Sequence, residues 1–125
     1  TKCDISLVSM YGVHNSRLLN FFTRYDRRFY ELTMALKYWA KTNELISQNM
    51  FSTYAFTMLI VFFLQQQKPP ILPTVIDLNR LAKKTKKSNQ QFIHNWDFDF
   101  CDDIESIEKS RNRSSTTSLF VEFFR

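Results

Sequence analysis

Two lysines stand four positions apart in "LKYWAK", residues 36–41. On a helix, Lys37 and Lys41 would lie one turn apart on the same face, where their like charges repel. A polyanion bound between them would turn that repulsion into attraction, and two flexible ammonium groups suit a triphosphate. The alternative is a solvated lysine pair with no ligand, which the spacing alone does not exclude.

The segment "STY", residues 52–54, precedes a long apolar run and so predicts a helix start. The hydroxyls of Ser52 and Thr53, together with the free N–H groups of a first helical turn, could meet a phosphate. The ring of Tyr54 offers a flat face on which a base could stack. The simpler interpretation is that Ser52 is a helix cap and Tyr54 a core residue.

Asn15 lies in "HNSR", residues 14–17. Its amide group both donates and accepts hydrogen bonds, so it could contact a ribose hydroxyl and a base carbonyl together. The simpler interpretation is a helix cap. His14 has no second metal ligand near it in sequence, and we expect a packed or surface histidine.

Three aspartates raise the possibility of metal binding. Asp4 lies in "CDISL", whose alternation predicts a strand with Cys3, Ile5 and Leu7 on one face and Asp4 on the other. These five residues allow either an ordinary exposed carboxylate or a metal ligand. Asp97 and Asp99 form a D-x-D, the arrangement of paired-metal polymerases. However, the single glycine is Gly12, so no glycine turn precedes them, and we interpret them as the solvated face of a short strand.

Helices must position these residues. Apolar residues recur at helical spacing within residues 18–25, and Asp26 is the expected N-cap of a helix over 27–41 with an apolar stripe. Ser52 caps a third helix that is apolar nearly all round, predicted to be buried and to end before Pro69 and Pro70. The remaining expected elements are a short basic helix followed by a loop within 78–91, a strand over 95–100, a polar linker over 106–118 and a last helix from residue 118.

The composition fits one small domain. The chain has 125 residues, of which 44% are hydrophobic and 16% aromatic, and a net charge of +5. These values exclude a disordered tail, and the positive charge is typical of domains that meet polyanions. The longest apolar run, near residues 54–64, is too short to span a bilayer, and no signal peptide is visible. Cys3 and Cys101 match no metal spacing, which favours a reducing compartment. Both ends interrupt a pattern, so we expect a fragment of a longer protein.

The motifs together resemble one family. "CDISL…VHNSRLL", "LKYWAK", "STYAFTMLIVFFLQ" and "KPPILPT" follow in the order found in terminal uridylyltransferases and related poly(A) polymerases of the nucleotidyltransferase superfamily. The resemblance runs from Cys3 to about Leu78 and resumes at "NWDFDF" and "SLFVEFFR". It implies a mainly α fold with a small β contribution (α+β). Residues 1–14 would end the catalytic palm domain, and residues 15–125 would form the helical central domain, running into the start of the poly(A)-polymerase-associated segment.

The resemblance also implies roles for single residues. Asp4 matches the third catalytic acid of the family, a metal ligand. The positions that match the family's nucleotide-binding motifs are Asn15, Ser16, Lys37, Lys41, Ser52, Thr53 and Tyr54. Family members usually carry a glycine shortly before the serine that corresponds to Ser52, where this chain has Met50 and Phe51. The family's first two acids and its Gly-Ser turn would lie before Thr1.

The implied activity is template-independent addition of UMP or AMP to RNA 3′ ends, with UTP or ATP as substrate and Mg²⁺ or Mn²⁺ on the carboxylates. The expected partners are the RNA 3′ end and the nucleoside triphosphate, without a membrane, inside the cell in the cytoplasm, nucleus or mitochondrion. The fragment alone should be inactive. The main alternative is a catalytically inactive relative that serves as an RNA-binding or scaffolding module. A plain helical interaction domain is a third interpretation.

Overall fold

The computed structural model describes residues 3, 5, 7, 10–47, 50–85, 92–93, 96–97 and 107–125. Its element order is α1 (Met10–Tyr25), α2 (Arg27–Thr42), α3 (Thr53–Gln65), α4 (Val75–Thr85), β1 (Phe92–Ile93), β2 (Trp96–Asp97) and α5 (Thr116–Phe123). The predicted mainly α class with a small β contribution is confirmed. None of the helices in these ranges is long and apolar enough to cross a membrane.

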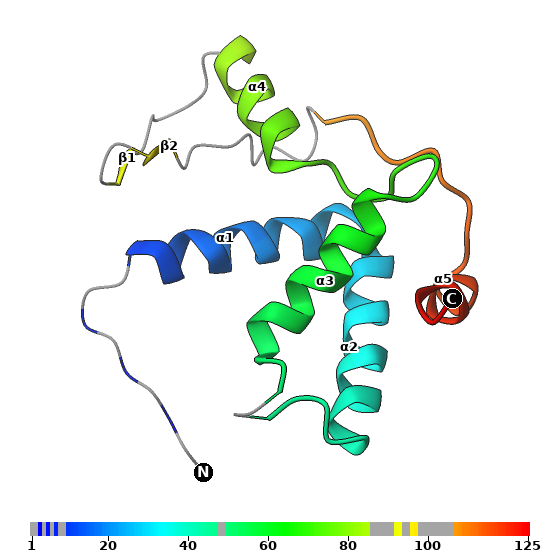
Figure 1. Ribbon diagram of the computed structural model, residues 1–125. Coiled ribbons are helices and arrows are strands. Elements are labelled where there is room, and N and C mark those ends of the chain that lie inside the picture. Colours follow the sequence, from blue (N-terminus) through cyan, green and yellow to red (C-terminus); the bar gives the residue numbers. More distant parts are fainter. Residues whose placement is uncertain are drawn as a thin grey trace.

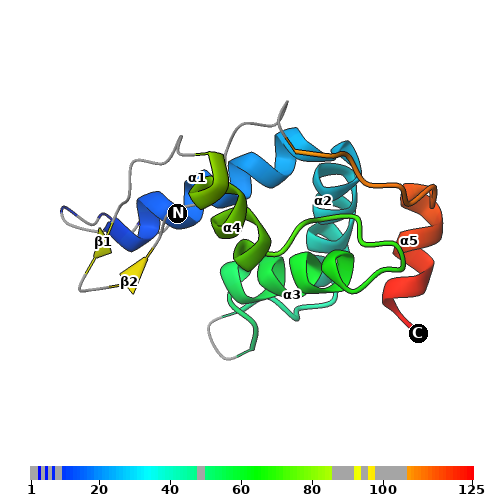
Figure 2. The ribbon, with the colours of Figure 1, turned by 90° about the horizontal axis from the view of Figure 1, so that it is seen from above.

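Helices α1 and α2 meet at a corner, and α3 crosses them (Figure 1). Helix α5 lies on the side of α2 away from α1, as Figure 2 also shows. Accordingly, α2 packs against α1, α3 and α5. The core between these helices is almost entirely aliphatic and aromatic, and its buried residues are Phe21, Phe22, Phe29, Leu32, Leu36, Ala40, Phe56, Ile60, Val61, Leu64, Ile71, Leu72, Leu78, Ile107 and Leu119.

Both predicted helix caps are confirmed. The Asp26 side chain accepts a hydrogen bond from the Arg28 N–H, at 2.9 Å, and so caps α2. Ser52 caps α3 by accepting from the Ala55 N–H, at 3.1 Å. Each side chain satisfies one of the N–H groups that a helix start leaves without an intrahelical acceptor. The caps thus fix where the two helices begin, and with that the register of every residue along them.

Two expectations about the long helices need correction. Helix α1 begins at Met10, so Asn15 lies inside the helix and is not a cap. Helix α3 is not buried all round, because Leu59 and Phe62 are 44% and 58% exposed. Helix α3 packs against α2 and receives Phe123 of α5, whereas the face that carries Leu59 and Phe62 stays open.

The expected strand near residue 4 is not formed at the described residues 3, 5 and 7. Ile5 is 83% exposed and Leu7 is 95% exposed. Alternation predicts a strand only where a neighbouring strand supplies hydrogen bonds and a face to cover. No described strand pairs with this segment. Asp4 itself lies outside the described residues.

The short sheet consists of β1 and β2, which pair antiparallel with Phe92 opposite Asp97 and Ile93 opposite Trp96. The expected strand over 95–100 is therefore described at Trp96–Asp97, and its partner Phe92–Ile93 was not predicted. Asp99 lies outside the described residues. The side chain of Asp97 is not described, so its assignment to a solvated face stays a prediction.

The predicted polar linker before α5 is tied to the helices by hydrogen bonds. Ile107 and Asn112 are 8% and 7% exposed. The Nδ2 group of Asn112 donates to the Pro69 carbonyl at 2.8 Å. Arg28 donates to the carbonyls of Asn112 and Ser114 at 2.8 and 2.9 Å. We call residues 107–114 the strap, because side-chain hydrogen bonds tie this extended segment across the helices.

Candidate functional site

Lys37 and Lys41 stand on one face of α2, one turn apart, as predicted. The buried stripe of α2 includes Leu36 and Ala40, each one residue before a lysine, so the lysines flank the core-facing side. Lys37 is half-buried and Lys41 is exposed. Within the described residues neither lysine has an ion-pair partner, so both positive charges are available to a ligand.

A cavity of about 210 Å³ opens beside Lys37 between α1, α2 and α3. It is lined by Leu19, Thr23, Phe29, Tyr30, Thr33, Met34, Lys37 and Thr57. Lys37 is the one charged residue in this lining. Three threonines add hydroxyl groups to an otherwise apolar wall. We call this cavity, together with Lys41 and the first turn of α3, the lysine cleft.

The first turn of α3 adjoins the same cavity. Thr57 lines it, and its hydroxyl donates to the Thr53 carbonyl one turn earlier, at 2.8 Å. Ser52 and Thr53 are exposed at the helix start. A helix N-terminus carries partial positive charge and unpaired N–H groups. The start of α3 is therefore linked to the cavity through Thr57.

Tyr54 and Asn15 lie near this cavity without lining it. Tyr54 is 48% exposed, so its ring is not a core residue and keeps a free surface. Asn15 is half-buried in α1, one turn before the cavity residue Leu19, and Ser16 beside it is exposed. Among the described residues no hydrogen bond joins Asn15 to the lysines or to the start of α3. Of the predicted site residues, Lys37 alone lines this cavity, and Thr57 lines it from α3, one turn beyond Thr53.

Thr33 is a cleft residue that the sequence analysis missed. It is 8% exposed, and its hydroxyl has no hydrogen-bond partner among the described residues. Thr33, Lys37 and Lys41 follow at intervals of four, so they form one stripe along α2. That spacing was the available signal, but threonine is so often a surface residue that the sequence alone gave no reason to choose it.

No cluster of three or more His, Cys, Asp or Glu side chains that could hold a metal ion occurs in the described part of the chain. Carboxylate oxygens are the ligands that Mg²⁺ takes. The described residues by themselves do not make such a set. A metal-binding role for Asp4 remains what the family resemblance implies.

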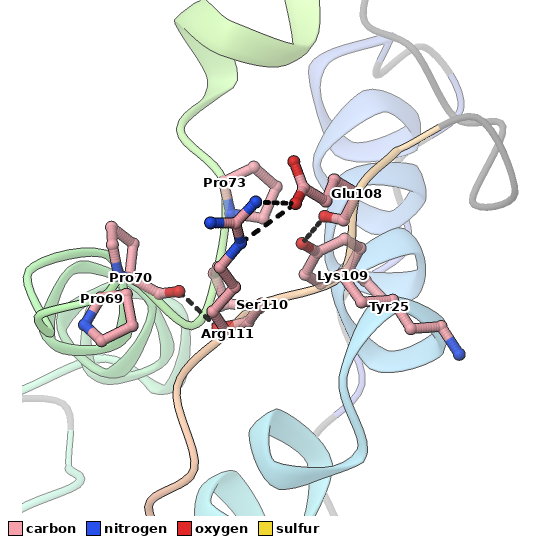
Figure 3. A pocket seen from close by; sticks show the side chains of 9 residues that line it. Tyr25, Pro69, Pro70, Pro73, Glu108, Lys109, Ser110 and Arg111 are labelled. Carbon is pink, nitrogen blue, oxygen red and sulfur yellow. Dashed lines mark hydrogen bonds and ion pairs between the residues drawn. The ribbon is translucent and has the colours of Figure 1, made fainter.

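A second cavity, of about 220 Å³, lies at the strap (Figure 3). It is bounded by the end of α1, the proline segment 69–73 and residues 108–111. The Tyr25 hydroxyl donates to the Glu108 carbonyl at 2.7 Å, and Arg111 pairs with the Glu108 carboxylate at 2.8 Å. Burial, and after it the charges of Asp26 and Glu108, raise the pKa of Tyr25. None of the predicted site residues lines this cavity.

Comparison with known proteins shows which class of protein this chain is similar to. No protein-family model matches the chain. The speckle targeted PIP5K1A-regulated poly(A) polymerase of Ailuropoda melanoleuca is 35% identical over 122 residues, which are 97% of this chain and 14% of that protein. Terminal uridylyltransferase cid1 of Schizosaccharomyces pombe is 31% identical over 127 residues, 99% of this chain and 30% of that protein.

A solved structure of mtPAP in complex with UTP matches with a TM-score of 0.89 at 30% identity, over 98% of this chain and 26% of that one. The fold and the sequence are therefore similar to a segment of nucleotidyltransferases. More particularly, this chain is a homologue of the poly(A) polymerases and terminal uridylyltransferases, which are RNA nucleotidyltransferases. It spans 14% of the length of the first of these relatives and 30% of the length of the second.

Proposed function

We propose that the protein containing this chain adds nucleotides to RNA 3′ ends without a template, and that the lysine cleft binds the triphosphate of the incoming nucleotide. The observation that carries the proposal is the position of Lys37, which lines a cavity shared with Thr57 while Lys41 stands one turn further along the same helix face. The family resemblance independently matches the same two lysines to its nucleotide-binding motifs.

Charge supports a triphosphate as the ligand. The two ammonium groups repel each other without a counter-charge, so an anion with several phosphates bridging them lowers the free energy of the pair. Hydroxyls and the N–H groups at the start of α3 add donors on a second side of the cavity. The half-exposed ring of Tyr54 would stack the base, and Asn15 would contact the ribose and base.

The names of similar proteins support the substrate class. Structures of mtPAP have been solved with UTP, GTP, CTP and ATPγS, so one similar fold accepts several bases. We propose UTP or ATP as the substrate of this protein and the RNA 3′ end as its second partner. One relative is named for nuclear speckles and one neighbour as a cytoplasmic RNA terminal U-transferase. We propose an intracellular site of action, in the nucleus or cytoplasm.

In this proposal residues 1–14 end a catalytic palm domain, and residues 15–125 form the central helical domain that carries most of the nucleotide contacts. Asp4 would be a catalytic, metal-holding carboxylate of the palm. Mg²⁺ or Mn²⁺ would supply charge neutralisation at the phosphates. The residues of the lysine cleft would bind and orient the triphosphate before that chemistry.

The test is a 3′-extension assay of the full-length protein on a short single-stranded RNA, with each of the four nucleoside triphosphates added separately. Extension with UTP or ATP, lost on Lys37→Ala together with Lys41→Ala, is the expected result. RNA binding without extension by any nucleotide would overturn the proposal in favour of an inactive RNA-binding relative. A matched control is Lys109→Ala, which removes an exposed lysine of the strap.

A further inference from the structure

Helix α5 and the residue after it contact two of the three helices that form the lysine cleft, α2 and α3, through two adjacent rings. The ring of Phe124, just past the end of α5, meets Trp39 of α2 edge-on, with centroids 4.6 Å apart and an interplanar angle of 69°. Phe123 makes edge contacts with Phe56 and Phe63 of α3, at 6.3 and 5.3 Å. The two phenylalanines contact each other at 5.5 Å. One pair of side chains therefore bridges α2 and α3.

The partners of these rings are close in sequence to the cleft residues. Trp39 lies between Lys37 and Lys41, on the opposite side of the helix, because two residues correspond to about 200° of rotation. Phe56 is in the first turn of α3, and its ring is 6.4 Å from that of Phe51, the residue directly before the cap Ser52. Movement of either helix at these contacts would move the cleft residues with it.

Helix α5 is held in place by contacts of its own. Leu119 is 1% exposed in the core. The Thr116 hydroxyl donates to the Glu31 carboxylate of α2 at 2.8 Å. The strap leading into α5 is tied by Arg28 to the start of α2. The rings of Phe123 and Phe124 thus extend from a fixed helix and can act as a reference point for α2 and α3.

We infer that Phe123 and Phe124 are positioning residues that set the spacing and rotation of α2 against α3, and so hold Lys37, Lys41 and the start of α3 at the distance a triphosphate requires. The inference rests on the proposed function. Burial in the core does not account for a phenylalanine at position 124, since Phe124 is 46% exposed. Its directed edge contact with Trp39 is the more specific feature, because edge-to-face pairs are orientation-dependent and packed helices do not deform continuously.

The experiment measures binding of UTP and ATP, and of uridine and adenosine, to the full-length protein by calorimetry, next to KM and kcat for 3′ extension. Phe124→Ala should weaken triphosphate binding by about threefold to tenfold and leave nucleoside binding within about twofold. Phe124→Tyr, which keeps the ring edge, should restore triphosphate binding. The matched control is Val121→Ala, which shortens an apolar side chain of α5 that is 52% exposed. It should change the affinity for neither the triphosphate nor the nucleoside.

A double-mutant cycle separates positioning from general loosening. If Phe124 acts through the lysines, Phe124→Ala should have little further effect on triphosphate binding in a Lys41→Ala background. Equal weakening of triphosphate and nucleoside, or full additivity with Lys41→Ala, would overturn the inference. Should Phe124→Ala not fold, Phe124→Leu keeps apolar volume without the ring edge, and unchanged triphosphate binding in that variant would also overturn it.

The proposed function can fail separately from this inference. Triphosphate binding that is unaffected by Lys37→Ala and Lys41→Ala would contradict the lysine cleft itself, and the positioning role would fall with it. Triphosphate binding that depends on the lysines and not on Phe124 would leave the cleft standing and remove the positioning role alone.

Discussion

The side chain of Asn112 donates a hydrogen bond to the carbonyl of Pro69 at 2.8 Å, across 43 positions of sequence. The same side chain accepts from the Ser114 N–H at 2.8 Å. Asn112 is 7% exposed, and both bonds are partly buried. This one residue joins the proline segment after α3 to the strap before α5.

Replacing Asn112 by Ala should destabilise the protein by about 1–3 kcal/mol, because two partly buried hydrogen bonds, to the Pro69 carbonyl and from the Ser114 N–H, are lost at about 0.5–1.5 kcal/mol each. Urea unfolding of the full-length protein, followed by circular dichroism, measures the change. Arg113→Ala, at an exposed neighbouring position, is the matched control and should change stability by less than about 0.5 kcal/mol. Equal stability of both variants would show that the strap is not held by this contact.

Replacing Asp26 by Ala should cost about 0.5–2 kcal/mol through loss of the α2 cap, and more through its ion pair. The side chains of Arg28 and Asp26 are only 19% and 14% exposed and lie 2.7 Å apart, so the substitution leaves a shielded charge. The control is Arg27→Ala. Arg27 pairs with Glu31, but its side chain is 88% exposed, so loss of this ion pair should change the stability little. Similar melting temperatures for the two variants would contradict this ranking.

Tyr25 should make stability fall at alkaline pH. Burial is the main reason why its pKa lies above the ordinary 10.0. The folded state therefore holds the phenolic proton more tightly than the unfolded state does. The resulting stability is fully present below about pH 10 and is lost as the pH rises through the folded pKa. Tyr25→Phe removes the hydrogen bond to Glu108, so it should be less stable at pH 7 and show a flatter stability profile above pH 10. A profile parallel to that of the unaltered protein would rule out this origin.

Lys37→Ala and Lys41→Ala should each weaken binding of a nucleoside triphosphate far more than binding of the matching nucleoside. The reason is that ammonium groups act on phosphate charge and not on the base. Raising the salt concentration should imitate both substitutions by screening the same charges. Equilibrium binding of UTP and uridine at two salt concentrations gives the comparison. An equal loss for both ligands would mean that the helix had been disturbed instead.

The aspartates should differ in their effects on catalysis. Asp4→Asn in the full-length protein should abolish 3′ extension without unfolding the protein, if Asp4 is the carboxylate that the resemblance implies. Asp97→Asn with Asp99→Asn should leave extension within a few-fold of normal. Measured initial rates on one RNA decide both. Loss of activity in the folded double variant would reverse the assignment and make the D-x-D the catalytic pair.

Local sequence signals determined the long helices and their starts. Asp26 and Ser52 cap helices because their side-chain oxygens reach N–H groups two or three residues ahead, an interaction within one turn of chain. The apolar stripe of α2 and the shared face of Lys37 and Lys41 follow from helical periodicity alone. The family resemblance rested on the same short motifs, and it led to the same lysines that line or adjoin the cleft.

Tertiary structure alone decided what those helices face. No pattern in "SIEKSRNRSSTTS" marks Asn112 as buried, because its partner Pro69 lies 43 positions earlier. The open outer face of α3 and the exposed Ile5 and Leu7 depend on whether another element covers them. The contact of Phe124 with Trp39 likewise required the path of the strap. Periodicity reports which side of an element is apolar. Burial depends on which segment, distant in the sequence, packs against that side, and a local pattern carries no information about that partner.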